Sequence, residues 1–244
     1  MRDFLQALSF LTILPFGKSL LPEDRTLGRS MAFFPLVGLV IGLLSASGYY
    51  LFSFLFPKPF ALWLTIGLLA LLTGGLHLDG LADTVDGLGS GGAREKILEV
   101  MRDSRIGAFG VIGLILLMGA KYLALDQMST RSIPYSLILM AVMGRNSMVL
   151  VCYRSRYARS QGGLAKPFTE NLGLREMAIS LISSLGIGLL LMGVKGIVVF
   201  FGLGLFSLGY RFFFNWKLGG VTGDILGAAN EMSELLCLII LIVL

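Results

Sequence analysis

The chain has 244 residues, of which 55% are hydrophobic and only 14% are charged, and its mean hydropathy is +0.83. Soluble domains carry roughly a quarter charged residues, so this composition excludes an ordinary soluble domain and indicates an integral membrane protein. The net charge of +5 does not predict nucleic-acid binding, because the basic residues are spread between apolar runs and form no stripe with aromatic residues.

The apolar segments, taken in chain order, predict the fold. Residues 4–16 contain a glutamine and a proline but no small-residue cleavage site, which favours an interfacial helix over a signal peptide. A span needs about 20 mostly apolar residues. Seven segments qualify, of which the second and fifth are short: 31–56, 60–76, 106–125, 133–153, 177–194, 196–214 and 224–244.

These segments predict an all-α fold, a polytopic membrane helical bundle of about seven transmembrane helices plus interfacial helices. Residues 1–244 are expected to form a single integral membrane catalytic domain, because no linker, repeat or low-complexity stretch divides the chain. Fourteen Lys and Arg residues fall in the N-terminal segment and every second connection, against three in the opposite connections. The positive-inside rule then places the N-terminus and the long connections in the cytoplasm.

Three aspartates follow the second apolar segment in HLDGLADTVDGLGSGG, residues 77–92. The helix is expected to continue from that span up to Gly87, which puts Asp79, Asp83 and Asp86 on one face at i, i+4 and i+7. Crowded carboxylates repel one another unless a cation neutralises them, and oxygen ligands at this density suit Mg²⁺ or Mn²⁺ together with substrate phosphates. The alternative is that these acids form a solvated helix end or structural ion pairs with nearby arginines. That alternative would explain a single acid better than it explains three on one face.

A short amphipathic helix is predicted after this segment, and it ends where the third span begins. Arg102 and Arg105 lie at that boundary beside Asp103 and are spaced to clamp a phosphate. The alternative is an interfacial helix whose basic residues only follow the positive-inside rule.

A second acidic group, Asp224, Glu231 and Glu234, follows a glycine-rich turn near the C-terminus. The spacing i, i+7 and i+10 puts all three on one helical face, so the two acidic faces of the chain could meet on the cytoplasmic side. A helix N-terminus also favours acids near its positive end, which makes Asp224 equally an N-cap candidate.

Three polar residues interrupt other spans. Arg145 and Asn146 are costly to bury in an apolar span. They are expected either to line a substrate cavity or, for Arg145, to pair with an intramembrane acid. Lys121 lies near a span end, where its side chain is expected to extend to the interface.

The segments FLTILP, FFPLVGLVIG, GGLHLDGLADTVDGL, RDSRIGAFGVIGL and GGVTGDILGAANE occur in this order along nearly the whole chain. Their sequence and spacing resemble the cobalamin synthase family, the adenosylcobinamide-GDP ribazoletransferases. This resemblance implies an enzyme of the bacterial inner (cytoplasmic) membrane, multi-pass, with its active site facing the cytoplasm. It further implies the last assembly step of the vitamin B12 nucleotide loop. In that step, the adenosylcobinamide-phosphate moiety of adenosylcobinamide-GDP is transferred to α-ribazole or its 5′-phosphate with release of GMP and participation of Mg²⁺.

The resemblance also suggests roles for particular residues. The metal ligands would be Asp79, Asp83, Asp86, Asp103, Asp224 and Glu231. The residues expected to take part in catalysis are Asp83, Asp86, Asp103 and His77, with a carboxylate or His77 accepting the hydroxyl proton. The substrate-binding candidates are Arg102, Arg105, Arg159 and Asn146.

Arg159 belongs to the segment YARSQGGLAKPF, which is similar to a basic cytoplasmic loop of the family. Ser160 and Gln161 stand there in place of the family's Pro and Glu. The partners expected are the two small-molecule substrates and membrane lipid, and not nucleic acid. A homo-oligomer and other cobalamin-assembly enzymes stay open as partners.

Three other functions fit the sequence less well. A CDP-alcohol phosphotransferase would carry arginine where this chain has Asp83, and an Asp-rich membrane prenyltransferase would have two separated, similar Asp-rich segments. A cation transporter would place its acids near the membrane midplane rather than at one face.

Overall fold

The structure is a computed structural model that describes residues 2–16 and 24–244. These residues are helical or lie in connections, apart from one isolated bridge between Tyr157 and Val221. The all-α prediction is therefore confirmed. Lys18, one of the basic residues assigned to the cytoplasmic side, lies outside the described residues.

The helices are α1 (Arg2–Leu11), α2 (Asp24–Ser30), η1 (Met31–Phe33), α3 (Phe34–Leu55), α4 (Lys58–Leu72), α5 (Leu76–Gly89), α6 (Arg94–Val100), α7 (Ala108–Gln127), α8 (Ile133–Cys152), α9 (Lys166–Asn171), α10 (Leu174–Met192), α11 (Val194–Leu218) and α12 (Gly223–Val243).

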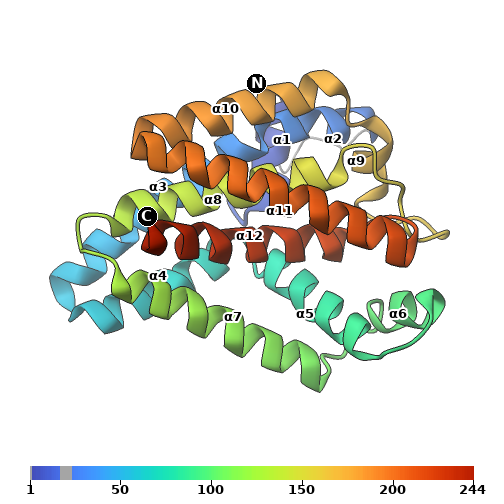
Figure 1. Ribbon diagram of the computed structural model, residues 1–244, viewed down its shortest axis with the longest axis horizontal. Coiled ribbons are helices and arrows are strands. Elements are labelled where there is room, and N and C mark those ends of the chain that lie inside the picture. The colour runs from blue at the N-terminus through green and yellow to red at the C-terminus, as the bar shows by residue number, and fades with distance from the viewer. Residues whose placement is uncertain (1, 17–23) are drawn as a thin grey trace.

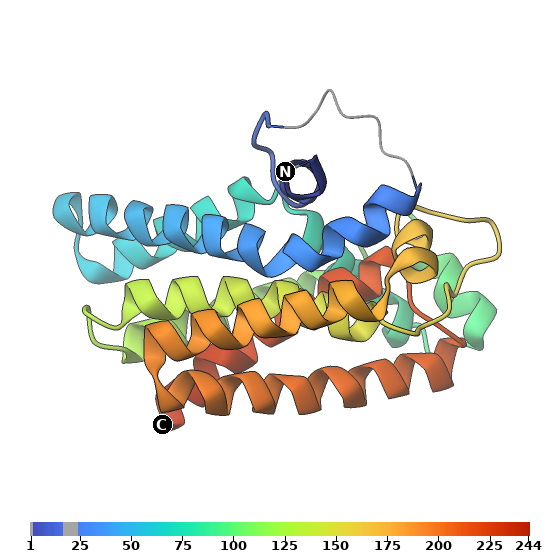
Figure 2. The same cartoon turned by 90° about the horizontal axis from the view of Figure 1, so that it is seen from above.

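The long helices lie side by side along one direction, with α8 at the centre of the bundle (Figures 1 and 2). Helix α8 contacts α3, α10, α11 and α12, and nearly all of its residues are buried. In contrast, α10 and α11 expose large apolar side chains such as Leu190 and Leu205. Apolar side chains that face outward on long helices are expected where lipid rather than water is the solvent.

The short helices α2, α6 and α9 gather at one end of the bundle, together with the longer connections (Figure 1). Tight turns near residues 56–58, 128–132 and 193 lie at the other end. This arrangement agrees with the predicted alternation of long and short connections, so the basic residues concentrate at the end that carries the short helices.

The second predicted span is not one continuous helix. Six helices are long and apolar enough to cross a membrane, or seven if α4 and α5 together form a broken span. Helices α4 and α5 meet at an angle of 89°, so the prediction that the helix continues to Gly87 is wrong. Gly74 and Gly75 both adopt positive φ, at 60° and 70°, a conformation that residues with a Cβ rarely tolerate. The pair therefore ends α4 and lets α5 leave in a new direction.

Helix α1 crosses the bundle rather than running along it, and Figure 2 shows it end-on. The Phe10 ring packs on that of Phe168 with centroids 4.9 Å apart, and Phe34 packs on Phe168 at 5.8 Å. The predicted N-terminal helix is thus present, and it contributes to the packing between α3 and α9.

Close packing of α3 on α8 depends on two glycines spaced four residues apart. A Cβ added at Gly42 would lie 2.5 Å from the Cα of Ile138, and one added at Gly38 would meet the backbone of Ala141. Small residues at such spacing allow helix backbones to approach closely in membranes, where apolar burial alone does not drive helices together.

We predict that Gly42→Ala lowers the thermal stability of the purified protein, because the added methyl meets backbone that cannot move aside cheaply. Overpacking of this kind costs about 1–3 kcal/mol. The matched control is Gly67→Ala in α4, where nothing lies within 4 Å of the added Cβ. Equal melting temperatures of the two variants in detergent would contradict the packing argument.

Candidate active site

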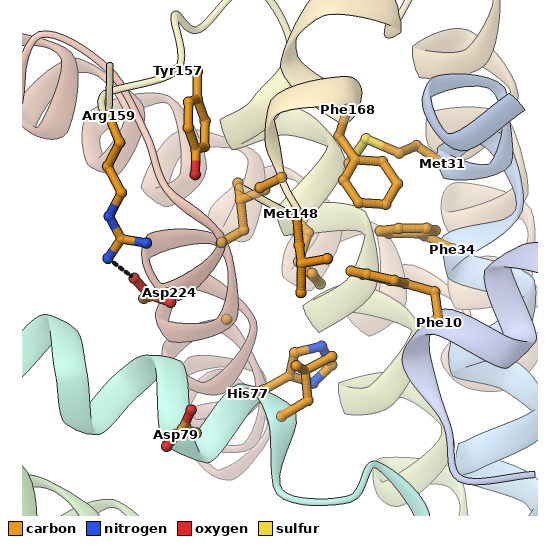
Figure 3. Close-up of a pocket in the computed structure, with 16 residues that line it drawn as sticks. Phe10, Met31, Phe34, His77, Asp79, Met148, Tyr157, Arg159, Phe168 and Asp224 are labelled. Atoms are coloured by element: carbon orange, nitrogen blue, oxygen red, sulfur yellow. Dashed lines mark hydrogen bonds and ion pairs between the residues drawn. The ribbon is translucent and has the colours of Figure 1, made fainter. Parts of the chain in front are cut away.

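A cavity of about 250 Å³ lies between α1, α3, α5, α8, α9 and the start of α12. We call it the main cavity. Figure 3 shows phenylalanine and methionine side chains on one side and Tyr157 with charged side chains on the other. Its lining includes Phe10, Met31, Phe34, Met148, Phe168, Tyr157, His77, Asp79, Arg159 and Asp224.

The two acidic helices meet at this cavity because α5 and α12 pack closely. A Cβ added at Gly80 would lie 2.9 Å from the Cα of Asp224, so only glycine allows this approach. The charge of Asp83 is consequently repelled by the charges of Asp224 and Asp79. The expectation that two acidic faces meet holds for these three carboxylates, of which Asp79 and Asp224 line the main cavity and Asp83 does not.

Arg159 is the cation bound to this acidic group in the described part of the chain. Its Nη2 donates to Asp224 Oδ2 at 2.6 Å and to the Met101 carbonyl at 3.1 Å. Asp224 is not the N-cap of α12, because the Thr222 hydroxyl accepts from the Ile225 amide and takes that position. The Asp224 side chain therefore remains directed toward the main cavity, as Figure 3 shows.

The donor chemistry of Asp79, Asp83 and Asp224 fits Mg²⁺, which prefers carboxylate oxygens. Across residues 2–16 and 24–244, no three acidic, His or Cys side chains already converge as a complete metal-binding group. Mg²⁺ is usually held by one or two carboxylates, with water and substrate phosphates filling the remaining positions. A partial carboxylate set beside a cavity is consistent with that mode of binding.

Asp86 shares the α5 face with Asp79 and Asp83, as predicted, but the structure does not bring its carboxylate to the main cavity. Its two oxygens accept hydrogen bonds from the amides of Gly107 and Gly110, at 2.7 and 2.8 Å. These amides belong to the first turn of α7, where a helix has unpaired donors and a positive dipole end. Asp86 therefore caps α7.

Asp103 lies apart from the main cavity and pairs with Arg105. The Arg105 guanidinium donates to both Asp103 oxygens and lowers the pKa of that carboxyl to about 2. Asp103 and Arg105 border a separate hollow that also contains Asp86. The structure thus places two of the expected metal ligands, Asp86 and Asp103, outside the group formed by Asp79, Asp83 and Asp224.

The predicted clamp of Arg102 and Arg105 on one phosphate does not form, because the two side chains point into different hollows. Arg102 donates to the side-chain oxygen of Gln161. It borders a hollow of about 430 Å³, the basic hollow, together with Arg94 and Arg159. Since Arg159 also lines the main cavity, the basic hollow and the main cavity adjoin.

Glu231 and Glu234 form a buried ion-pair network instead of a metal site. Lys121 donates to both carboxylates at 2.6 Å, and Arg145 pairs with Glu234. All four side chains are at most 7% exposed. The prediction that Arg145 pairs with an intramembrane acid is confirmed, whereas the prediction that Lys121 extends to the interface is wrong. Glu231 is also separate from the carboxylates at the main cavity, because it pairs with Lys121 of α7 inside the bundle.

Asn146 does not line the main cavity. Its side-chain oxygen accepts a hydrogen bond from the Ser180 hydroxyl at 2.9 Å between α8 and α10. The residue is 3% exposed. Asn146 therefore joins two helices, and the structure does not place it with the other substrate-binding candidates.

The aromatic side of the cavity was not predicted from the sequence. Phe10, Phe34 and Phe168 come from three separate segments, and each looks like ordinary apolar core. The signal that could have found them is their location, because they lie within FLTILP, FFPLVGLVIG and YARSQGGLAKPF. All three segments are among those that resemble the cobalamin synthase family.

The fold and site define a multi-pass membrane protein with a carboxylate-and-arginine site at one end of its helical bundle. The family model described as Cobalamin-5-phosphate synthase matches residues 3–242. The chain belongs to this cobalamin-5-phosphate synthase family.

Several curated relatives carry the name adenosylcobinamide-GDP ribazoletransferase. The protein of that name from Geotalea daltonii is 43% identical, covering 99% of this chain and 97% of its own length. The one from Syntrophobacter fumaroxidans is 41% identical over 95% and 94% of the two chains, and one from Klebsiella pneumoniae is 37% identical over 99% of both. No solved structure matches this chain.

We predict that Asp86→Ala destabilises the protein by about 1–2 kcal/mol, because two amides of the first turn of α7 lose their acceptor. Asp86→Asn keeps one acceptor oxygen and should lie between the wild type and Asp86→Ala in thermal unfolding. An Asp86→Ala protein that melts like the wild type would contradict the capping role.

We predict that Lys121→Met is far more destabilising, on the order of 3 kcal/mol, because it leaves two buried carboxylates without their shared cation. Adding Glu231→Gln to this variant removes one uncompensated charge and should restore part of the loss. The control is Lys195→Met at an exposed position. Thermal unfolding in detergent gives the stability of the single, double and control variants. A double variant no more stable than Lys121→Met would contradict this account.

Proposed function

We propose that this chain transfers the adenosylcobinamide-phosphate moiety of adenosylcobinamide-GDP to α-ribazole or its 5′-phosphate and releases GMP. Family membership and the name shared by its relatives support this activity. The structural observation that carries it is the meeting of Asp79, Asp224 and Arg159 at the main cavity, with Asp83 near enough for its charge to be repelled by both carboxylates. The relatives give no support to a CDP-alcohol phosphotransferase, a prenyltransferase or a cation transporter.

The reaction is a phosphoryl-type transfer. A ribose hydroxyl of the acceptor attacks the phosphorus that carries cobinamide, a new P–O bond forms, and the P–O bond to the GMP leaving group breaks. The hydroxyl proton passes to a base, and negative charge develops on the phosphoryl oxygens. Such reactions depend mainly on positioning and on electrostatic stabilisation of that charge.

The residues at the site divide these tasks. Asp79, Asp83 and Asp224 would hold Mg²⁺, which when bound supplies Lewis-acid stabilisation of the diphosphate oxygens. Arg159 lies between the main cavity and the basic hollow, where its guanidinium can bind a phosphate oxygen of the donor. Arg102 borders the same hollow and would neutralise the leaving GMP.

The site is proposed to face the cytoplasm of a bacterial cell from its inner membrane. The excess of basic residues at the end that carries α2, α6 and α9 supports this orientation. The main cavity and the basic hollow open near these helices, so both substrates would arrive from the cytoplasm.

Turnover by the purified protein tests the proposal. With adenosylcobinamide-GDP and α-ribazole in Mg²⁺ buffer, the wild type should release GMP, whereas a CDP-alcohol with an acceptor should give no CMP. Asp83→Ala should lower turnover on the order of 100-fold or more, because a carboxylate of the charge-stabilising group is lost. Chelation of divalent metal should have a comparable effect.

The matched control is Glu170→Ala, which removes an exposed carboxylate of α9 that lines neither the main cavity nor the basic hollow. Its melting temperature and turnover should stay close to those of the wild type. A folded Asp83→Ala protein with near-normal turnover, or full activity in the presence of chelator, would refute the role given to the carboxylates.

A further inference from the structure

His77 has a ring nitrogen that lacks a partner. It is the only histidine of the chain, it is 1% exposed, and it lines the main cavity. Its Nε2 has no hydrogen-bond partner among the described residues. Buried polar atoms are nearly always paired, so this nitrogen points to a partner that the protein does not itself supply.

The other ring nitrogen determines what kind of partner this must be. Nδ1 faces Nη2 of Arg145 at 3.4 Å. A guanidinium only donates, so Nδ1 must accept and carry the lone pair. Arg145 is held in place by its ion pair with Glu234. In a neutral imidazole the remaining nitrogen, Nε2, then carries the hydrogen and is a donor. His77 therefore does not serve as the base for the acceptor hydroxyl, which leaves that task to a carboxylate.

The walls around His77 restrict the rest of the ligand. Phe10, Phe34 and Phe168 form an aromatic cluster, and Met31 and Met148 add apolar surface beside it. Asp79, Asp224 and Arg159 stand on the other side of the cavity, as Figure 3 shows. The cavity thus suits a flat apolar ring that accepts a single hydrogen bond and is joined to a hydroxyl-bearing group.

We propose that the aromatic side of the main cavity binds the base of the acceptor nucleoside and that His77 Nε2–H donates to its free ring nitrogen. This inference rests on the proposed function. The base of α-ribazole is a dimethylbenzimidazole, which is planar and apolar apart from one unsubstituted nitrogen that only accepts. With this ring against the aromatic cluster, the attached ribose extends toward Asp79 and Asp224.

The two other large parts of the substrates fit this cavity poorly. Guanine carries several donors and acceptors along its edge, and the apolar wall would leave most of them unpaired. A corrin ring with its side chains is far larger than a cavity of about 250 Å³. The cavity therefore selects the acceptor base, while the basic hollow is left for the nucleotide of the donor.

Kinetics with both substrates test this inference. His77→Ala should raise KM for α-ribazole about tenfold, the effect of one lost hydrogen bond in a buried site, and leave KM for adenosylcobinamide-GDP within twofold. His77→Gln retains a side-chain donor and should recover part of the loss. In the dimethylindole riboside, C–H replaces the free ring nitrogen of the base. The wild type should use this acceptor about tenfold less well than α-ribazole, whereas His77→Ala should use the two acceptors equally well.

A second variant tests the aromatic side independently of His77. Phe10→Leu should raise KM for α-ribazole severalfold because a ring contact is lost. Its control is Phe201→Leu, where the ring is 65% exposed on the outside of α11. Equal increases of KM for both substrates in Phe10→Leu would overturn the assignment of this side to the acceptor base.

A wild type that uses the indole riboside as well as α-ribazole would overturn the hydrogen bond, even if His77→Ala fails to fold. If the wild type shows no transfer at all, the proposed function fails. Equilibrium dialysis of α-ribazole against wild type and Phe10→Leu then still decides the inference: weaker binding by the variant supports the site, and equal or absent binding overturns it.

Discussion

The close contact between α5 and α12 is the constraint on which the site depends. Gly80 lets the two backbones approach, and Gly227 does the same opposite the backbone of His77. Because of this contact, Asp79 and Asp83 lie beside Asp224, and the ring of His77 lies between the main cavity and Arg145. A larger separation of the helices would move Asp79 and Asp83 away from Asp224 and would remove His77 from its guanidinium partner.

The acids of α12 occupy two different environments. Glu231 and Glu234 are buried with Lys121 and Arg145, so their charges are compensated within the protein. The group at the main cavity has more carboxylates than cations, which is tolerable only where solvent, an ion or a charged substrate can reach it. The excess of negative charge therefore distinguishes the main cavity, which we interpret as a ligand site, from the ion-pair network, which joins helices.

Patterns along single segments predicted much of this structure. The apolar runs gave the long helices, the i and i+4 spacing put Asp79 and Asp83 on one face, and the cost of a buried charge correctly predicted an acidic partner for Arg145. Spacing could not show which neighbour each side chain meets. The carboxylate of Asp86 turns to the amides of α7, and Lys121 binds Glu231 from a helix more than 100 residues away in sequence.

The break between α4 and α5 and the crossing of α1 depend on each other. A helix that ends inside the bundle leaves carbonyl groups without partners, and the amide of Ile13 donates to the carbonyl of Leu72 at 2.9 Å. The same N-terminal segment places Phe10 against Phe168, which closes the aromatic side of the main cavity. The chain after α1 thus satisfies the end of α4 while α1 itself forms a wall of the site. Since α5 begins at this break, the position of its acids depends on a segment some sixty residues earlier, a dependence that no local pattern in either segment contains.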